Sequence, residues 1–262
     1  MHYAASSLVL VLCLAGCATP PLQETKAFVS AVNTVNSAAD ALVDEINVAE
    51  KARYSRLHAK DPVFELNNAY YVSTISETPA ALNYRKGLTV LQDYANLLQS
   101  LVDGSGINAV HAQAETLAAN ISAIAGAPEV AVVAKALLPV LDRITAAANV
   151  AEARHMAVGG AKAVHDLLAA LRDGAPAMYE YLTLDLRRTR APYERLQEYR
   201  VAVANYVVLI DKLDSTFSQL IVAFDRPSNP ITLAALVDAS AQLKANVSAA
   251  RQSLVALRRS GI

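Results

Sequence analysis

Apolar side chains recur at alternating spacings of three and four residues through every long segment of this sequence. This spacing places them on one stripe of an α-helix, and it constrains the fold more than any other feature of the chain. Alanine, which forms helices readily and lets helices approach closely, is frequent along the same stripes. Aromatic residues make up 6% of the chain and tryptophan is absent, which disfavours a β-sandwich. The sequence therefore predicts an all-α fold.

Proline and glycine lie where such helices are expected to begin or end. Thr78-Pro79 predicts a helix start with a capping side chain, whereas Pro139 and Pro192 fall inside periodic segments and predict kinks. The fourth and fifth helices are expected to exceed about 40 residues, or about 60 Å in length. We predict an elongated antiparallel bundle of about six helices. Their apolar stripes cover residues 28–49, 84–102, 107–124, 130–171, 199–224 and 233–257.

Two segments depart from this simple pattern. Residues 61–77 combine β-branched and aromatic residues with turn formers, and we expect an ordered loop packed across one end of the bundle. A short hairpin and a continued helix are the alternatives. Gly159 and Gly160 lie inside the fourth predicted helix, where two glycines cost about 2 kcal/mol relative to alanine. Either a close helix crossing or a hinge accounts for them.

The N-terminal residues have the features of an export signal. Residues 8–14 are uniformly apolar, and no charged side chain precedes Glu24. This apolar run is too short to span a bilayer. Small residues follow it, and Leu14-Ala15-Gly16-Cys17 resembles the lipobox of bacterial lipoproteins. The alternative is an ordinary cleaved signal with an incidental cysteine.

The lipobox resemblance implies that residues 1–16 are removed and that Cys17 becomes the acylated first residue. Several acyl chains give stable anchoring, whereas one binds only marginally. Residues 17–24 would then form a short tether, and residues 25–262 a single helical domain. The residue after Cys17 is not Asp, which in proteobacterial lipoproteins implies the outer membrane, with the body in the periplasm. Cys13 would leave with the signal, so no disulfide is expected in the mature chain.

The charge balance argues against a nucleic-acid partner. The chain has 23 Lys and Arg and 24 Asp and Glu, for a net charge of −1, which leaves no electrostatic excess to hold a nucleic-acid backbone or an anionic bilayer. No segment reaches the roughly 18 uncharged apolar residues that a membrane-spanning helix needs. Membrane association is therefore expected through the N-terminal lipid.

The histidines and carboxylates do not predict a catalytic or metal site. His155 and His165 are not at the i, i+4 spacing of a helical metal pair. Glu152 and His155 have the Glu-x-x-His spacing of di-iron bundles, but those proteins need two such motifs and two further carboxylates. Residues 104–106, Gly-Ser-Gly, lack the spacing of a nucleophile turn. We expect no enzymatic activity, no cofactor and no metal.

Tyrosines and arginines interleave between residues 179 and 206. Forked guanidinium hydrogen bonds and aromatic stacking suit a phosphate, a carboxylate or a sugar. The alternative is that the tyrosines fill the helix seam while the arginines pair with nearby Asp and Glu. The candidate patch, called the Arg/Tyr patch below, consists of Arg187, Arg188, Arg190, Tyr193 and Arg195.

These features favour a lipid-anchored, non-enzymatic binding or scaffolding module that displays a helix face to an envelope partner. An envelope protein, lipopolysaccharide and peptidoglycan are the candidate partners, and the apolar content permits self-association. The alternative is a membrane-active protein that resembles the α-helical pore-forming toxins of the cytolysin A type in architecture. An apolar hairpin over residues 116–141, broken at Gly126-Ala127-Pro128, is the feature behind that alternative.

Overall fold

The computed structural model describes residues 21–124, 128–142, 149–188 and 193–226, and single positions between 234 and 252. All regular elements in these ranges are helical and no strand occurs there, which confirms the all-α prediction. The elements are α1 (Leu22–Leu57), the 3-10 helix η1 (Leu66–Asn68), α2 (Ala69–Val72), α3 (Pro79–Val102), α4 (Ile107–Ser122), α5 (Pro128–Lys135), α6 (Leu138–Leu141), α7 (Val150–Gly159), α8 (Ala161–Asp173), α9 (Ala175–Arg188) and α10 (Tyr193–Asp225).

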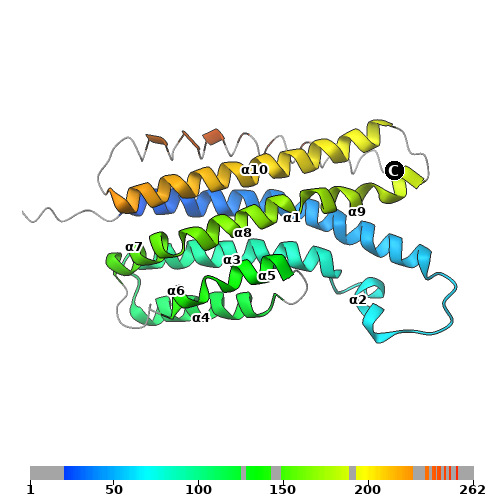
Figure 1. The fold of residues 1–262 in the computed structure, drawn as a ribbon, viewed down its shortest axis with the longest axis horizontal. Coiled ribbons are helices and arrows are strands. Elements are labelled where there is room, and N and C mark those ends of the chain that lie inside the picture. Colours follow the sequence, from blue (N-terminus) through cyan, green and yellow to red (C-terminus); the bar gives the residue numbers. More distant parts are fainter. Residues whose placement is uncertain are drawn as a thin grey trace, which may run out of the picture.

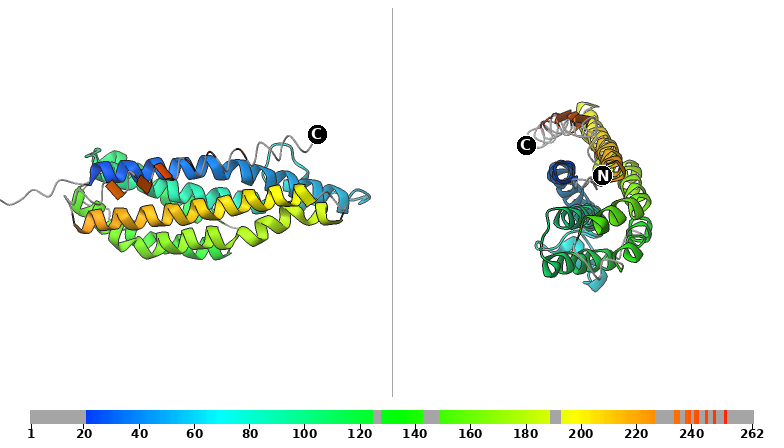
Figure 2. Two further views of the ribbon diagram at one scale, coloured as in Figure 1. Left: turned by 90° about the horizontal axis from the view of Figure 1, so that it is seen from above. Right: turned by 90° about the vertical axis from the view of Figure 1, so that its left-hand side faces the viewer.

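The helices run lengthwise in an elongated bundle (Figures 1 and 2). Helix α1 has 36 residues, or about 54 Å at 1.5 Å per residue, and it packs against both α3 and α10. Helix α4 packs on α3, and α8 packs on α10 and α5. We call the end where α1 begins the proximal end. The distal end is the opposite one, where α1 and α9 finish and α10 starts (Figure 1).

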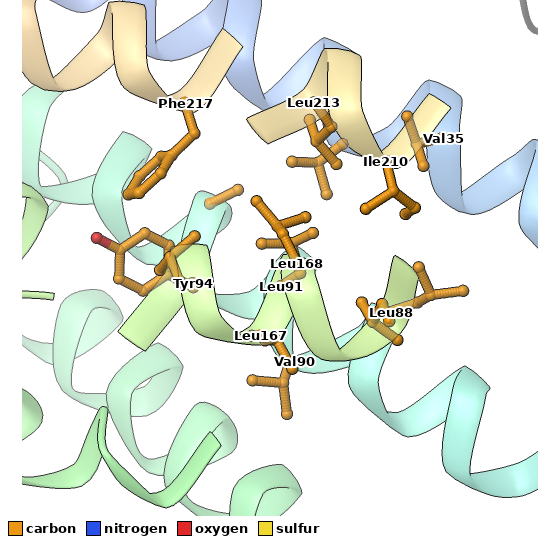
Figure 3. Packing of buried hydrophobic residues seen from close by; sticks show 14 of the residues in the cluster. Val35, Leu88, Val90, Leu91, Tyr94, Leu167, Leu168, Ile210, Leu213 and Phe217 are labelled. Carbon is orange, nitrogen blue, oxygen red and sulfur yellow. The ribbon is translucent and has the colours of Figure 1, made fainter. Parts of the chain in front are cut away.

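The apolar stripes of α1, α3, α8 and α10 meet in one core (Figure 3). At its centre the ring of Phe217 lies 5.3 Å from that of Phe28 and 6.0 Å from that of Tyr94, measured between centroids. All three rings are fully buried. Most buried side chains of the core lie within the stripes predicted for the first three helices and for the fifth. These four helices face the same interior.

The fourth predicted helix is a series of shorter helices. Pro139 lies in the first turn of α6 and does not kink a continuous helix, since a turn after Lys135 has already ended α5. Gly160 separates α7 from α8, and Gly174 separates α8 from α9. The prediction of about six helices with a long fourth one is wrong for this reason. The sequence Asp173-Gly174-Ala175-Pro176 predicts the connection between α8 and α9, whereas the predicted stripe continues through Gly160 and does not reveal that break.

Three tyrosine hydroxyls bind carbonyl groups at these breaks. The hydroxyl of Tyr94 donates to the carbonyl of Met156 (3.0 Å), that of Tyr206 to Leu171 (3.1 Å) and that of Tyr84 to Gly174 (2.7 Å). Burial raises the pKa of Tyr94 and of Tyr206, so both hydroxyls keep the proton that they donate.

Helix boundaries elsewhere match the predictions with small corrections. Helix α3 begins after Thr78 as predicted, but the Thr78 side chain makes no capping hydrogen bond, and its amide donates to Oδ1 of Asn47 on α1 (2.9 Å). Helix α1 begins at Leu22, so the last three residues of the predicted 17–24 tether are helical. Helix α10 has 33 residues, fewer than the 40 or so predicted.

Several predictions fall on residues that the structure does not describe. They are the signal and Cys17, the break at Gly126-Ala127, the kink at Pro192, and most of the sixth helix.

Candidate functional site

The Arg/Tyr patch lies at the distal end, at the connection between α9 and α10 (Figure 1). Arg187 and Arg188 are exposed in the last turn of α9, and Tyr193, the first residue of α10, is 65% exposed. Arg195 is half-buried, and its buried Nε has no hydrogen-bond partner in the described part of the chain. Arg190 lies outside the described residues. The structure therefore brings four of the five patch residues to one end of the molecule.

The tyrosines of the interleaved segment divide into core and surface residues. Tyr206 is buried, and Tyr199 packs against the core. Burial raises the pKa of Tyr199, and the Glu45 carboxylate on α1 adds to this, while Arg195 opposes it. These two tyrosines fill the seam, as the structural alternative predicted. Tyr193 does not, because it faces solvent.

A groove of about 650 Å³ opens where the break between α8 and α9 faces α10. The guanidinium of Arg200 stacks over the ring of Tyr179 at 6.0 Å, which gives the groove a cation beside an aromatic face. Arg172 is already engaged, since it binds Asp173 (2.9 Å) and Asp211 (3.5 Å). Tyr179 and Arg200 belong to the interleaved segment, and the groove adds them to the five residues of the Arg/Tyr patch as groups for stacking and forked hydrogen bonding.

The distal loop, residues 58–78, contributes a second surface at the same end. Residues 55–67 are all exposed, and only η1 and α2 are helical within the loop. The prediction of an ordered loop is confirmed over a hairpin or a continued helix, but the loop does not bury its apolar residues against the bundle. Six of them face solvent: Val63 (71% exposed), Phe64 (65%), Leu66 (82%), Tyr70 (54%), Val72 (56%) and Ile75 (96%). We call these six side chains the distal apolar tip.

Contacts with α1 hold the distal loop in place. The ammonium group of Lys51 donates to the carbonyls of Ser73 (2.7 Å) and Ser76 (2.5 Å). The ring of Tyr54 stacks between His58 (4.2 Å) and Tyr71 (5.1 Å). These groups border an open cavity of about 620 Å³ between the loop and α1. The distal apolar tip is thus carried by a fixed segment.

A buried carboxylate supports the base of the loop. Glu50 on α1 is 9% exposed and lies at the first turn of α3. Burial raises its pKa, while the hydroxyl of Thr78 and the backbone amides of Ala80 and Ala81 partly offset that shift. Its second oxygen, Oε2, has no hydrogen-bond partner in the described chain. Ionising this group therefore costs free energy in the folded state.

Glu50→Gln is expected to remove a pH dependence of stability. The folded-state pKa of Glu50 is raised above 4.5, so the native state binds more protons than the unfolded state in the interval between the two pKa values. The free energy of unfolding then falls as pH rises through that interval. Urea unfolding should show this decline for the wild type and a flatter profile for Glu50→Gln. The exposed Glu65→Gln is the control and should keep the wild-type profile.

Two histidines, His165 and His58, pair with aspartates. Nδ1 of His165 on α8 lies 2.5 Å from Oδ1 of Asp214 on α10, and the His165 ring meets the edge of Phe217 at 5.2 Å. His58 binds Asp61 in the distal loop (2.5 Å). Among the described residues, no group of three or more His, Cys, Asp and Glu side chains is placed to hold a metal ion.

The apolar hairpin behind the pore-forming alternative lies in the core. Leu117 and Ile121 of α4, Val130 of α5 and Leu141 of α6 are buried, whereas Val132 is 69% exposed. Within the described ranges, no helix combines the length and the apolar character needed to cross a membrane. The four buried side chains therefore belong to the core.

Comparison with known proteins does not assign the chain to a family. No protein-family model matches it, and neither the curated proteins nor the solved structures contain a significant match. A functional proposal accordingly has to rest on the residues and geometry described above.

Proposed function

We propose that this chain is a lipid-anchored, non-enzymatic binding module of the bacterial cell envelope, held in the outer membrane with its helical body in the periplasm. The observation that carries the proposal is that the lipobox-like segment and the exposed candidate binding residues belong to opposite ends of the bundle. The lipobox-like segment precedes the proximal end, where α1 begins at Leu22. The Arg/Tyr patch and the exposed loop residues lie at the distal end.

The tether supports this arrangement. Only residues 18–21 separate Cys17 from the start of α1 at Leu22, and the five residue steps from Cys17 to Leu22 reach about 16 Å at 3.3 Å per residue. An acylated Cys17 would therefore hold the proximal end against the membrane. The surfaces available to a partner would lie along the bundle and at its distal end.

The partner chemistry follows from the exposed groups. Exposed arginines beside aromatic rings suit phosphate, carboxylate or sugar groups, which lipopolysaccharide, peptidoglycan and acidic envelope proteins all present. No cofactor, metal or nucleic acid enters this proposal. The exposed apolar residues also permit self-association.

The anchor is tested by the intact mass of the protein purified from a bacterial membrane. The wild-type chain is expected to begin at Cys17 and to carry the added mass of a diacylglycerol thioether. Cys17→Ser should lose that mass and retain residues 1–16, because the acceptor sulfur is gone. Cys13→Ser is the matched control, since that cysteine belongs to the removed segment, and its mature mass should equal that of the wild type. A wild-type chain without acyl mass would overturn the anchor.

A further inference from the structure

The distal apolar tip is carried by a projecting loop, and one of its side chains, Val72, also lines the open cavity between the loop and α1. The loop that carries it extends beyond the ends of α3 and α10 (Figures 1 and 2). Its six apolar side chains are all more than half exposed, and Ile75 reaches 96%. Contiguous exposed apolar surface on a soluble body marks a site of interaction with another protein or a membrane.

Some backbone groups of the loop are paired within the protein. The amide of Asn68 donates to the carbonyl of Glu65 (3.0 Å), and that of Ser73 donates to Ala69 (2.8 Å). The ammonium group of Lys51 donates hydrogen bonds to the carbonyl oxygens of Ser73 and Ser76. Pairing of this kind matters because an unpaired backbone group costs free energy away from water.

A bilayer fits this surface better than a protein partner or a second copy does. A stable protein interface uses roughly 20–30 residues on each side, with complementary shape, and the tip offers six apolar side chains on a convex loop. A lipid surface needs neither a matching groove nor that area. Transfer of each large apolar side chain out of water favours the bound state by roughly tenfold or more.

Basic residues precede the tip in the sequence. Residues 51–78, which include all six tip residues, hold four basic residues, Lys51, Arg53, Arg56 and Lys60, and three acidic ones, Asp61, Glu65 and Glu77. Arg56 and Lys60 are exposed and precede Val63 by seven and three residues. Basic residues next to apolar ones are attracted to anionic headgroups.

We propose that the distal apolar tip inserts into the interfacial region of a phospholipid bilayer, with Arg56 and Lys60 facing anionic headgroups. Insertion extends about 5–10 Å, to the boundary between headgroups and acyl chains. This contact goes beyond the proposed function and does not require the acyl group. Where Cys17 is acylated, both ends of the bundle contact lipid, and its long axis lies along the membrane.

The absence of tryptophan supplies a direct test. Phe64→Trp places a single fluorophore in the tip of the full chain, which is purified and mixed with vesicles of phosphatidylglycerol and phosphatidylcholine. The control, Val132→Trp, puts a fluorophore on α5 at a site of similar exposure, 69% against 65%. Vesicles made with acyl-brominated lipid should quench and blue-shift the emission of Phe64→Trp and leave that of Val132→Trp unchanged.

A second set of variants tests which side chains insert. Leu66→Ser and Ile75→Ser, each made in the Phe64→Trp chain, should weaken vesicle binding by roughly tenfold, because each removes one apolar group from the tip. Both sites are exposed, so the urea unfolding curve should stay unchanged. Replacing phosphatidylglycerol by phosphatidylcholine should weaken binding further.

Three results would overturn the proposal. They are no quenching of Phe64→Trp, equal quenching of Val132→Trp, and a lipid-free blue shift of Phe64→Trp that grows with protein concentration, which would identify a second copy as the occupant. The intact mass of the same samples reports separately on the Cys17 anchor, so failure of the tip and failure of the anchor are distinguishable.

Discussion

Phe217→Ala is expected to lower the free energy of unfolding by about 3–5 kcal/mol, the cost of replacing a fully buried phenylalanine with alanine. Phe217 on α10 contacts rings from three other helices, namely Phe28 of α1, Tyr94 of α3 and His165 of α8. Truncation leaves a cavity where these helices meet, and the surrounding side chains are too closely packed to fill it. Urea unfolding followed by the helical circular dichroism signal measures the loss.

Phe64→Ala is the matched control, because it makes the same chemical change at a side chain that is 65% exposed in the distal loop. Exposed substitutions usually change stability by less than about 0.5 kcal/mol. The two variants should therefore differ by several kcal/mol. If both variants lost the same free energy of unfolding, or if Phe217→Ala lost none, the contact of Phe217 with α1, α3 and α8 would not be the centre of the core.

Gly160→Ala is expected to destabilise the fold by about 1–3 kcal/mol, as overpacking does. An added Cβ would lie 2.7 Å from the carbonyl oxygen of Met156 and 3.2 Å from the hydroxyl oxygen of Tyr94. The first contact is with backbone, so α7 and α8 would have to shift. That shift would also disturb the hydrogen bond from Tyr94 to Met156.

The neighbouring glycine should respond in the opposite direction. Gly159 is the last residue of α7, and an added Cβ there would come no closer than 3.8 Å to another atom, Cε1 of His155. Gly159→Ala should stabilise the protein by about 0.5–1 kcal/mol through helix propensity alone. Thermal or urea unfolding of the pair measures the contrast. A destabilised Gly159→Ala together with a neutral Gly160→Ala would refute the close approach of Tyr94 to Gly160.

Sequence periodicity predicted those parts of the fold that depend on which face of a helix is buried. The stripes of residues 28–49, 84–102 and 107–124 lie in α1, α3 and α4, close to their observed bounds. It did not predict the break at Gly160, because an apolar stripe continues through a short turn that a tyrosine from another helix stabilises. The break at Gly174 was predictable from the sequence, since Asp173-Gly174-Ala175-Pro176 is typical of a tight connection between helices. The Gly159-Gly160 pair was the signal available, and the approach of Tyr94 favours a close crossing at Gly160.

The sequence pattern predicted the place of the candidate site in part. Interleaved arginine and tyrosine pointed to the connection between α9 and α10, where Arg187, Arg188, Tyr193 and Arg195 lie. The exposure of the distal apolar tip was not predictable, because the sequence around Phe64 and Ile75 does not indicate whether the bundle buries these side chains. The loss of three-four spacing after Leu57 was the available signal, because it shows that those apolar residues belong to no helix stripe.

Helix α1 runs without a break from the tether to the distal loop, so its length sets the distance between the two ends of the bundle. Adding or deleting one turn in α1 would move the distal loop by about 5.4 Å along the bundle axis. Helix α10 would have to change by one turn as well, so that its apolar side chains still meet those of α1. Length variation confined to the loop would instead leave the span untouched. The spacing between the two ends is thus encoded in the number of turns that two antiparallel helices share.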